Sequence, residues 1–245
     1  MGVPNVSERR FIRWVPEDPS EPTSTLVLTS EHSYFVDIRV LKDSVRDAAD
    51  TAGIDWAFAG SSVSRPAHEE KGCIVPAHSV WTHWVDSRVP YDGEASSDEG
   101  NMWTQPDGDV LEKGSMVRPE TGHLTEYEEL WADVDVQRTG DDLKKVCVVL
   151  TVDDPTRRAR GMVVRVGQWC QGITKVGGEL LIERWKYGMG EVLLTESSCW
   201  SRIFKIGQPS LDLPCFATFI PERVSIGHVF DAGDLQWRVT EKSEW

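Results

Sequence analysis

The sequence predicts an all-β protein built from two antiparallel β-structures, barrels or sandwiches, joined near the middle of the chain. Short runs rich in Val, Ile, Thr, Phe and Trp recur about every 8 to 15 residues between clusters of Gly, Pro, Asp and Ser, a pattern typical of strands and turns. Few stretches have helical periodicity, and no long helices alternate with the strands as a parallel sheet would require. Each half of the 245 residues is long enough for one small barrel.

The first half, residues 1–140, is expected to contain one barrel. Its strands are separated by turn-rich segments, of which the longest is the loop Pro16–Ser24. The strands that we expect are Arg10–Val15, Thr25–Thr29, Tyr34–Leu41, Ile54–Gly60, His78–Asp86 and Val110–Val117.

One or two short helices are expected to interrupt these strands. Asp43–Thr51 has the composition of a short helix. Thr125 and Glu128 form a capping box before Leu130 and Trp131, which predicts a helix of about two turns there.

The second half, residues 141–245, is expected to contain the second barrel, with the break between the halves near Arg138–Asp142. Gly188-Met189-Gly190 predicts a hairpin turn. The strands that we expect are Lys144–Val152, Gly161–Cys170, Leu180–Tyr187, Glu191–Thr195, Cys199–Ile206, Phe216–Ile220 and Leu235–Thr240.

The formal net charge is −14, and all of the excess lies in the first half, which has 26 acidic and 12 basic side chains. A field of this sign repels phosphate backbones and anionic lipids, so nucleic acids and membranes are not expected partners. Four of the acids lie in Tyr91–Gly100, which has turn residues and no apolar period, as in a solvated loop. The alternative is an acidic docking site for a basic protein partner.

The cysteines and histidines do not have the spacing of a zinc site or a disulfide framework. No phosphate-binding Gly-rich loop, nucleophile elbow or His-Glu-x-x-His motif occurs, so we expect neither a metal nor a cofactor. The apolar runs are too short to cross a bilayer and the N-terminal segment lacks signal-peptide character, which predicts a cytoplasmic protein. The five cysteines are Cys73, Cys147, Cys170, Cys199 and Cys215.

The 11 tryptophans are numerous beside four tyrosines. A cavity lined with Trp suits flat or polycyclic ligands, because the ring offers a wide apolar face and one N–H donor. The alternative is that these rings fill the core and close the barrel ends. The candidate ligand-binding residues are Trp56, Phe58, Trp81, Trp84, Trp169 and Trp185.

Strand alternation in the segment His78–Arg88 places Trp81, His83 and Val85 on one face and Thr82, Trp84 and Asp86 on the other. If His83 points inward beside Trp81, it is a candidate general acid or base in an aromatic pocket. The alternative is a histidine that is exposed, or buried with satisfied hydrogen bonds.

Alternation in Tyr34–Leu41 gives one almost wholly apolar face, which should pack in the core. Asp37 and Arg39 lie on the other face and are expected to form an ion pair in solvent. The alternative is a catalytic pair at a barrel mouth, with Arg39 stabilising a developing negative charge.

Three segments, IDWAFAGSS at Ile54–Ser62, LTEYEELWADVDV at Leu124–Val136 and MVVRVGQWCQGI at Met162–Ile173, resemble the fungal HRI protein family. Weaker similarity runs through Gly108–Gly122. The resemblance implies two lipocalin-like β-barrel domains and no particular catalytic residue. It also implies a non-catalytic binding role, since the family is named for interaction with a casein kinase.

A second resemblance, carried by no single motif, is to the cofactor-free fungal hetero-Diels–Alderases that join a tropolone quinone methide to a sesquiterpene. It implies a cyclase of secondary metabolism that holds two small apolar metabolites in register in a Trp-rich cavity. His83 and Arg39 would then be the catalytic residues. A non-catalytic binding or kinase-interacting module is the alternative, and a homodimer is also open.

Overall fold

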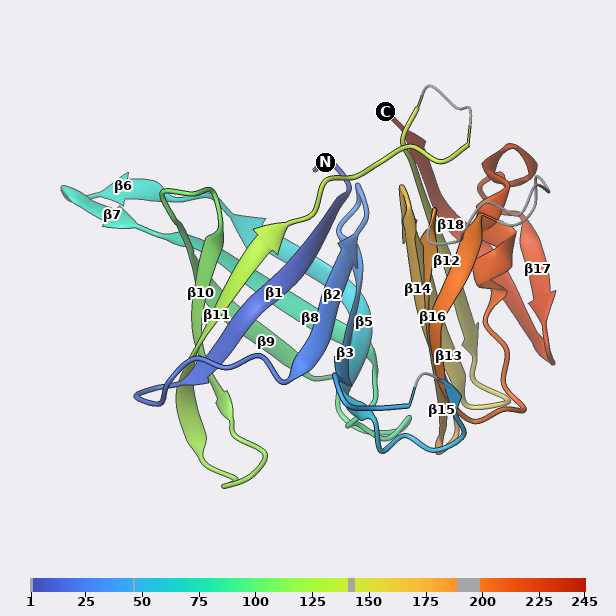
Figure 1. Cartoon of the computed structure of the whole chain (residues 1–245), viewed down its shortest axis with the longest axis horizontal. Coiled ribbons are helices and arrows are strands. Elements are labelled where there is room, and N and C mark those ends of the chain that lie inside the picture. Colours follow the sequence, from blue (N-terminus) through green and yellow to red (C-terminus); the bar gives the residue numbers. More distant parts are fainter. Residues whose placement is uncertain (1, 46, 141–143, 189–198) are drawn as a thin grey trace.

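The computed structural model describes residues 2–45, 47–140, 144–188 and 199–245, and the predicted all-β class is confirmed (Figure 1). Eight strands of the first half close into an antiparallel barrel. In their order around the barrel they are β1 (Asn5–Trp14), β11 (Leu124–Asp133), β10 (Val110–Val117), β9 (Ser97–Thr104), β8 (Ala77–Asp86), β5 (Ile54–Arg65), β3 (Tyr34–Leu41) and β2 (Thr23–Thr29).

The second half forms an eight-stranded sheet beside the barrel (Figure 1). Its outermost described strands are β17 and β4, so it has two edges where a second closed barrel was expected. The edge strand β4 comes from the first half and pairs in parallel with β16. In order, the strands are β17 (Val229–Ala232), β18 (Leu235–Glu244), β12 (Val146–Asp154), β13 (Ala159–Val166), β14 (Trp169–Val176), β15 (Glu179–Tyr187), β16 (Trp200–Gly207) and β4 (Asp47–Ala48).

Three small elements complete the described structure. The hairpin of β6 (His68–Glu70) and β7 (Cys73–Val75) projects away from the barrel (Figure 1). Two short 3-10 helices, η1 (Pro214–Phe219) and η2 (Pro221–Arg223), lie between β16 and β17. In the described ranges, no helix has the length and apolar character needed to cross a membrane.

Both helices expected in the first half were wrong. The capping-box segment at Thr125 lies inside β11, because pairing with β1 and β10 prevails over the local capping preference. The described residues of Asp43–Thr51 form turns and the short strand β4. The segment Tyr91–Gly100 is a solvated loop only in part, because its last residues begin β9.

Two strands expected in the second half were wrong, and a third lies outside the described residues. Gly161–Cys170 is not one strand, because Gly167, in the left-handed region at φ 52°, turns the chain from β13 into β14. Phe216–Ile220 was expected as a strand but falls mainly in η1, where Pro214 begins a helical turn. Glu191–Thr195 and the hairpin residues 189–190 lie outside the described residues.

The apolar face of β3 packs outward and not into the barrel. Val36, Ile38 and Val40 join one buried cluster with residues of the second sheet such as Ile173 and Ile182. The other face of β3 therefore points into the barrel. The expectation that Asp37 and Arg39 face solvent was wrong, since they are 3% and 5% exposed.

Candidate functional site

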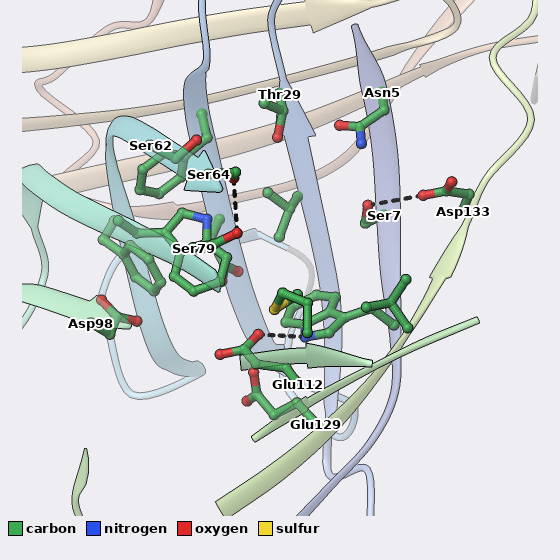
Figure 2. A pocket seen from close by; sticks show the side chains of 18 of the residues that line it. Asn5, Ser7, Thr29, Ser62, Ser64, Ser79, Asp98, Glu112, Glu129 and Asp133 are labelled. Atoms are coloured by element: carbon green, nitrogen blue, oxygen red, sulfur yellow. Dashed lines mark hydrogen bonds between the residues drawn. The ribbon is translucent and has the colours of Figure 1, made fainter. Parts of the chain in front are cut away.

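The barrel encloses a cavity of about 330 Å³ (Figure 2). The described residues that line it all belong to the first half. In Figure 2 the carboxyl groups of Asp98, Glu112 and Glu129 lie at one end of the cavity, which we call the floor. The small polar side chains lie toward the other end, which we call the mouth: Asn5, Thr29, Ser62 and Ser64.

Strand alternation places the lining residues. On β11, alternate residues Tyr127, Glu129, Trp131 and Asp133 point inward. They pass from fully buried Tyr127 and Glu129, through half-buried Trp131, to exposed Asp133 at the mouth. Sequence reasoning missed this series, although its period of two was visible and contradicts a helix.

Five charged residues, of which Glu129 belongs to the floor, form a connected network. The guanidinium of Arg39 donates to Asp37 Oδ2 at 2.8 Å and to Glu129 Oε1 at 2.9 Å. Arg9 also binds Glu129, and its Nε donates to Glu21 Oε2 at 2.8 Å. Burial would lower the pKa of Arg39, but Asp37 and Glu129 raise it well above its usual value, so Arg39 stays a cation.

Asp37 is only partly satisfied by this network. Its Oδ2 accepts both hydrogen bonds from Arg39, whereas its Oδ1 is buried and has no hydrogen-bond donor among the described residues. Burial raises the pKa of this carboxyl group, and the charge of Arg39 opposes that rise only in part. A ligand donor at Oδ1 would complete its hydrogen bonding.

His83 is buried between two carboxylates. Its Nδ1 lies 2.8 Å from Asp86 Oδ2, its Nε2 pairs with Asp98, and its ring stacks on Phe58 with centroids 4.1 Å apart. Burial would lower the pKa of His83, but hydrogen bonds to Asp86 and Asp98 and their charges raise it to about 9. At neutral pH the imidazole is therefore a cation, which suits a proton donor and not a base.

A β-bulge explains why His83 and Asp86, three residues apart, meet on one face. The pairing of β5 with β8 shifts between Ala59 and Gly60, so Trp84 has no partner on β5 and the alternation of β8 changes. Gly60 allows this close approach, because a Cβ there would clash with the carbonyl of Thr82. The prediction that Asp86 shares the face of Trp84 was wrong.

Glu112 on β10 is a floor residue that sequence reasoning missed. Tyr127 Oη donates to its Oε1 at 2.6 Å, and Trp131 Nε1 donates to its Oε2 at 2.9 Å. Burial and the nearby charge of Glu129, directly opposite on β11, raise the pKa of Glu112 to about 8. Glu112 is therefore largely a neutral acid at pH 7.

Two glycines make room for this arrangement. A Cβ at Gly100 would lie 2.6 Å from Glu112 Cγ, and a Cβ at Gly114 would lie 2.6 Å from Tyr127 Oη. Neither position tolerates a larger residue unless the floor side chains move. These glycines were the sequence feature that could have indicated the site, since they interrupt two otherwise ordinary strands.

The candidate ligand-binding residues named from sequence separate into two groups. Phe58 and Trp81 line the cavity, and Trp56 lies behind Phe58, where its Nε1 donates to Asp86 at 2.9 Å. The structure does not bring the other three to the cavity. Trp84 and Trp169 pack where the barrel meets the second sheet, and Trp185 packs in the separate core of the second half.

Of the two candidate catalytic residues, Arg39 lines the cavity and His83 lies behind its wall, linked to the floor through Asp98. The described residues contain no group of three or more His, Cys, Asp and Glu side chains that could hold a metal ion. The arrangement can hold a small molecule against aromatic rings, donate a proton from Glu112 and attract positive charge.

Comparisons with known proteins match nearly the whole chain. A family model described as Protein HRI1 matches residues 5–241. A Protein HRI1 from Vanderwaltozyma polyspora is 24% identical over 251 residues, which cover 96% of this chain and 98% of that protein. A crystal structure of an uncharacterized protein from Saccharomyces cerevisiae aligns with a TM-score of 0.71 at 20% identity, over 99% of this chain and 100% of that one. At this identity the structural likeness shows the fold alone.

Proposed function

The chain belongs to the HRI1 family, and from its barrel cavity we propose that it binds a small organic molecule there. The observation that carries the proposal is the cavity itself. Its volume of about 330 Å³ lies within the range of small-molecule sites. A barrel of eight strands can be filled by its own side chains, but here the inner faces leave this space open.

The lining supports a ligand with two kinds of surface. Phe35, Phe58, Trp81 and Trp131 offer apolar rings against which a flat body can stack. The floor offers buried polar groups such as Glu112 that can orient one end of the ligand. A ligand without polar groups would leave these buried groups without partners, at a cost in affinity.

A cavity-blocking variant tests this proposal. Ser62 lines the cavity, whereas its neighbour Ser61 is exposed on the outer face of the same strand. We expect wild type and Ser61→Trp, after incubation with a fungal metabolite extract and gel filtration, to retain a common small molecule that Ser62→Trp does not. Mass spectrometry after denaturation gives the readout. Equal retention by all three proteins, or by none, contradicts cavity binding.

We also propose catalysis as a second function, because Glu112 places a neutral acid at the end of an aromatic cavity. Glu112 would protonate the departing hydroxyl of a hydroxymethyl-substituted phenol or tropolone. The C–O bond then breaks and water leaves. The ring hydroxyl returns its proton to Glu112, and the substrate becomes a quinone methide without the help of a cofactor. A terpene alkene held against Trp81 would then add to the quinone methide.

The catalytic proposal has its own test. Glu112→Gln cannot supply the proton, so we expect formation of new adducts from the extract to fall about 100-fold or more while the ligand is still retained. Glu126→Gln makes the same change on an exposed residue of β11 and should leave adduct formation unchanged. Equal adduct formation by Glu112→Gln and wild type would exclude Glu112 as the acid.

A further inference from the structure

The inside of the barrel carries more acids than bases. Two clusters of ion pairs and the unpaired Glu112 bring six carboxyl groups and three cationic side chains together around the floor, counted among the described residues. With Glu112 neutral, this set of side chains is still negative. The acids are Glu21, Asp37, Asp86, Asp98, Glu112 and Glu129, and the cations are Arg9, Arg39 and His83.

The three cations already have carboxylate partners on two sides. Arg39 bridges Asp37 and Glu129, and His83 bridges Asp86 and Asp98. Arg9 bridges Glu21 and Glu129 in the same way. An anionic ligand would have to displace one of these pairs, so it is disfavoured on both charge and hydrogen bonding.

Two carboxyl groups that line the cavity, in contrast, are incompletely partnered by the described residues: Asp37 lacks a donor at one oxygen, and Glu112 lacks a cation. Asp37 Oδ1 is a buried oxygen of a residue 3% exposed, and no described residue donates to it. Glu112 accepts from the neutral donors Tyr127 and Trp131, and no cation among the described residues pairs with it. Both residues line the cavity, so each offers a carboxyl group to the positive group of a bound molecule.

Aromatic rings lie next to these acids. Trp81 is the direct cross-strand neighbour of Asp98, and Trp131 donates its N–H to Glu112. Both rings line the cavity and are half-buried. A cation bound here would be attracted both by the charge of the carboxylate and by the negative face of the aromatic ring.

We infer that the barrel ligand is a small organic cation, an amine or guanidine on a flat apolar body. Its charged group lies at Asp37, Asp98 and Glu112, and its body lies against Trp81 and Trp131. The inference rests on the proposed small-molecule binding and specifies its ligand class. Binding of the cation ionises Glu112, so a proton leaves the protein as the ligand enters.

Three probes with the same indole body test the charge preference: tryptamine as the cation, tryptophol as the neutral form and indole-3-acetate as the anion. Titration calorimetry of wild type at neutral pH should show tryptamine binding at least about 10-fold more tightly than tryptophol, with indole-3-acetate weakest. Glu112→Gln should lose most of the advantage of tryptamine, whereas Glu126→Gln should keep it. The tryptamine enthalpy should depend on the buffer, because a proton is released.

The outcomes separate this inference from the function on which it rests. If tryptophol or indole-3-acetate binds as tightly as tryptamine, the cation preference is wrong, while loss of that binding in Ser62→Trp would still support cavity binding. If none of the three probes binds, an indole-sized cation is excluded as the ligand. Retention of extract molecules by wild type but not by Ser62→Trp would then still support a small-molecule barrel.

Discussion

Glu112 and Glu129 face each other across neighbouring strands, yet their surroundings differ. Glu129 holds the guanidinium groups of Arg9 and Arg39, whereas the partners of Glu112 among the described residues are the neutral donors Tyr127 and Trp131. Two opposed carboxylates in a low-dielectric interior repel each other, so the one without cations keeps its proton. The raised pKa of Glu112 therefore depends on the cations that keep Glu129 ionised as much as on the burial of Glu112 itself.

This difference predicts how stability depends on pH. The pKa of Glu112 rises from 4.5 to about 8 on folding, so between these values the folded chain binds one proton more than the unfolded chain. For this group the free energy of unfolding falls by about 1.4 kcal/mol per pH unit as pH rises. Relative to wild type, Glu112→Gln should be roughly 3 kcal/mol more stable at about pH 8 than at about pH 5.5 in urea unfolding. Glu126→Gln should instead track wild type at both pH values.

His83 predicts a different dependence. Because its folded pKa of about 9 lies above the usual 6.5, its stabilisation is complete below pH 6.5 and is lost as pH rises through 9. His83→Ala should cost about 3 kcal/mol near neutral pH, since it leaves two carboxylates without their cation. His78→Ala, on a partly exposed imidazole of the same strand, should cost less than about 1 kcal/mol in the same unfolding assay. Equal losses in the two variants would contradict the buried ion pair.

At the scale of the strand, the sequence predicted two elements with the bounds found, Tyr34–Leu41 and Val110–Val117. What it did not predict is which face of β3 points into the barrel. An apolar face indicates that a strand is buried, but it does not indicate which element covers it. Here Val36 and Ile38 pack on the second sheet. The polar face had to line the cavity because both faces of this strand are buried.

The candidate site was predictable only in part, for the same reason. Strand alternation predicted that Trp81 and His83 lie on the same face of β8, and the structure agrees. The location of Asp86 depends on the β-bulge, and that of Glu112 on the register of β10 with β11. Register and bulges depend on partners that are distant in sequence, so no local pattern specifies them.

Gly114 on β10 gives a prediction at this scale. A methyl group there would contact the ring and hydroxyl of Tyr127, whose hydroxyl donates to Glu112. Gly114→Ala should therefore cost about 1 to 3 kcal/mol and weaken ligand retention. Gly178→Ala, where a methyl group has open space, should change stability by less than about 1 kcal/mol. Denaturant unfolding of both variants checks the prediction, and a neutral Gly114→Ala would contradict it.

At the scale of the molecule, the two halves share one apolar core. Outward residues of the barrel strands and one face of the second sheet form a single buried cluster. Two polar side chains of the sheet also reach the barrel backbone: Gln171 Nε2 donates to Val36 O at 3.0 Å, and Arg184 Nη2 donates to Ile38 O at 2.9 Å. The second sheet therefore buries the outer face of β3 and also holds its backbone in place through these hydrogen bonds.

This shared core predicts one cooperative unfolding transition. Leu28 is fully buried in the shared cluster, while Val27 points into the cavity. Leu28→Ala should cost about 2 to 5 kcal/mol and shift the transition of both halves together. Val27→Ala should cost about 1 kcal/mol, because it only enlarges a cavity already present. Calorimetry and tryptophan fluorescence should give the same midpoint, and a separate barrel transition would contradict the shared core.

The strand pair that closes the barrel joins distant parts of the chain. β1 pairs with β11, so that Ser7 lies opposite Asp133. During synthesis on the ribosome the barrel therefore remains an open sheet with two unpaired edges until β11 has emerged. The outer face of β2 and β3 stays uncovered for longer, until the strands of the second sheet follow. Because its contacts join residues distant in sequence, the chain should fold slowly. While the sheet is still open, chaperones that cover its edges should help it to fold.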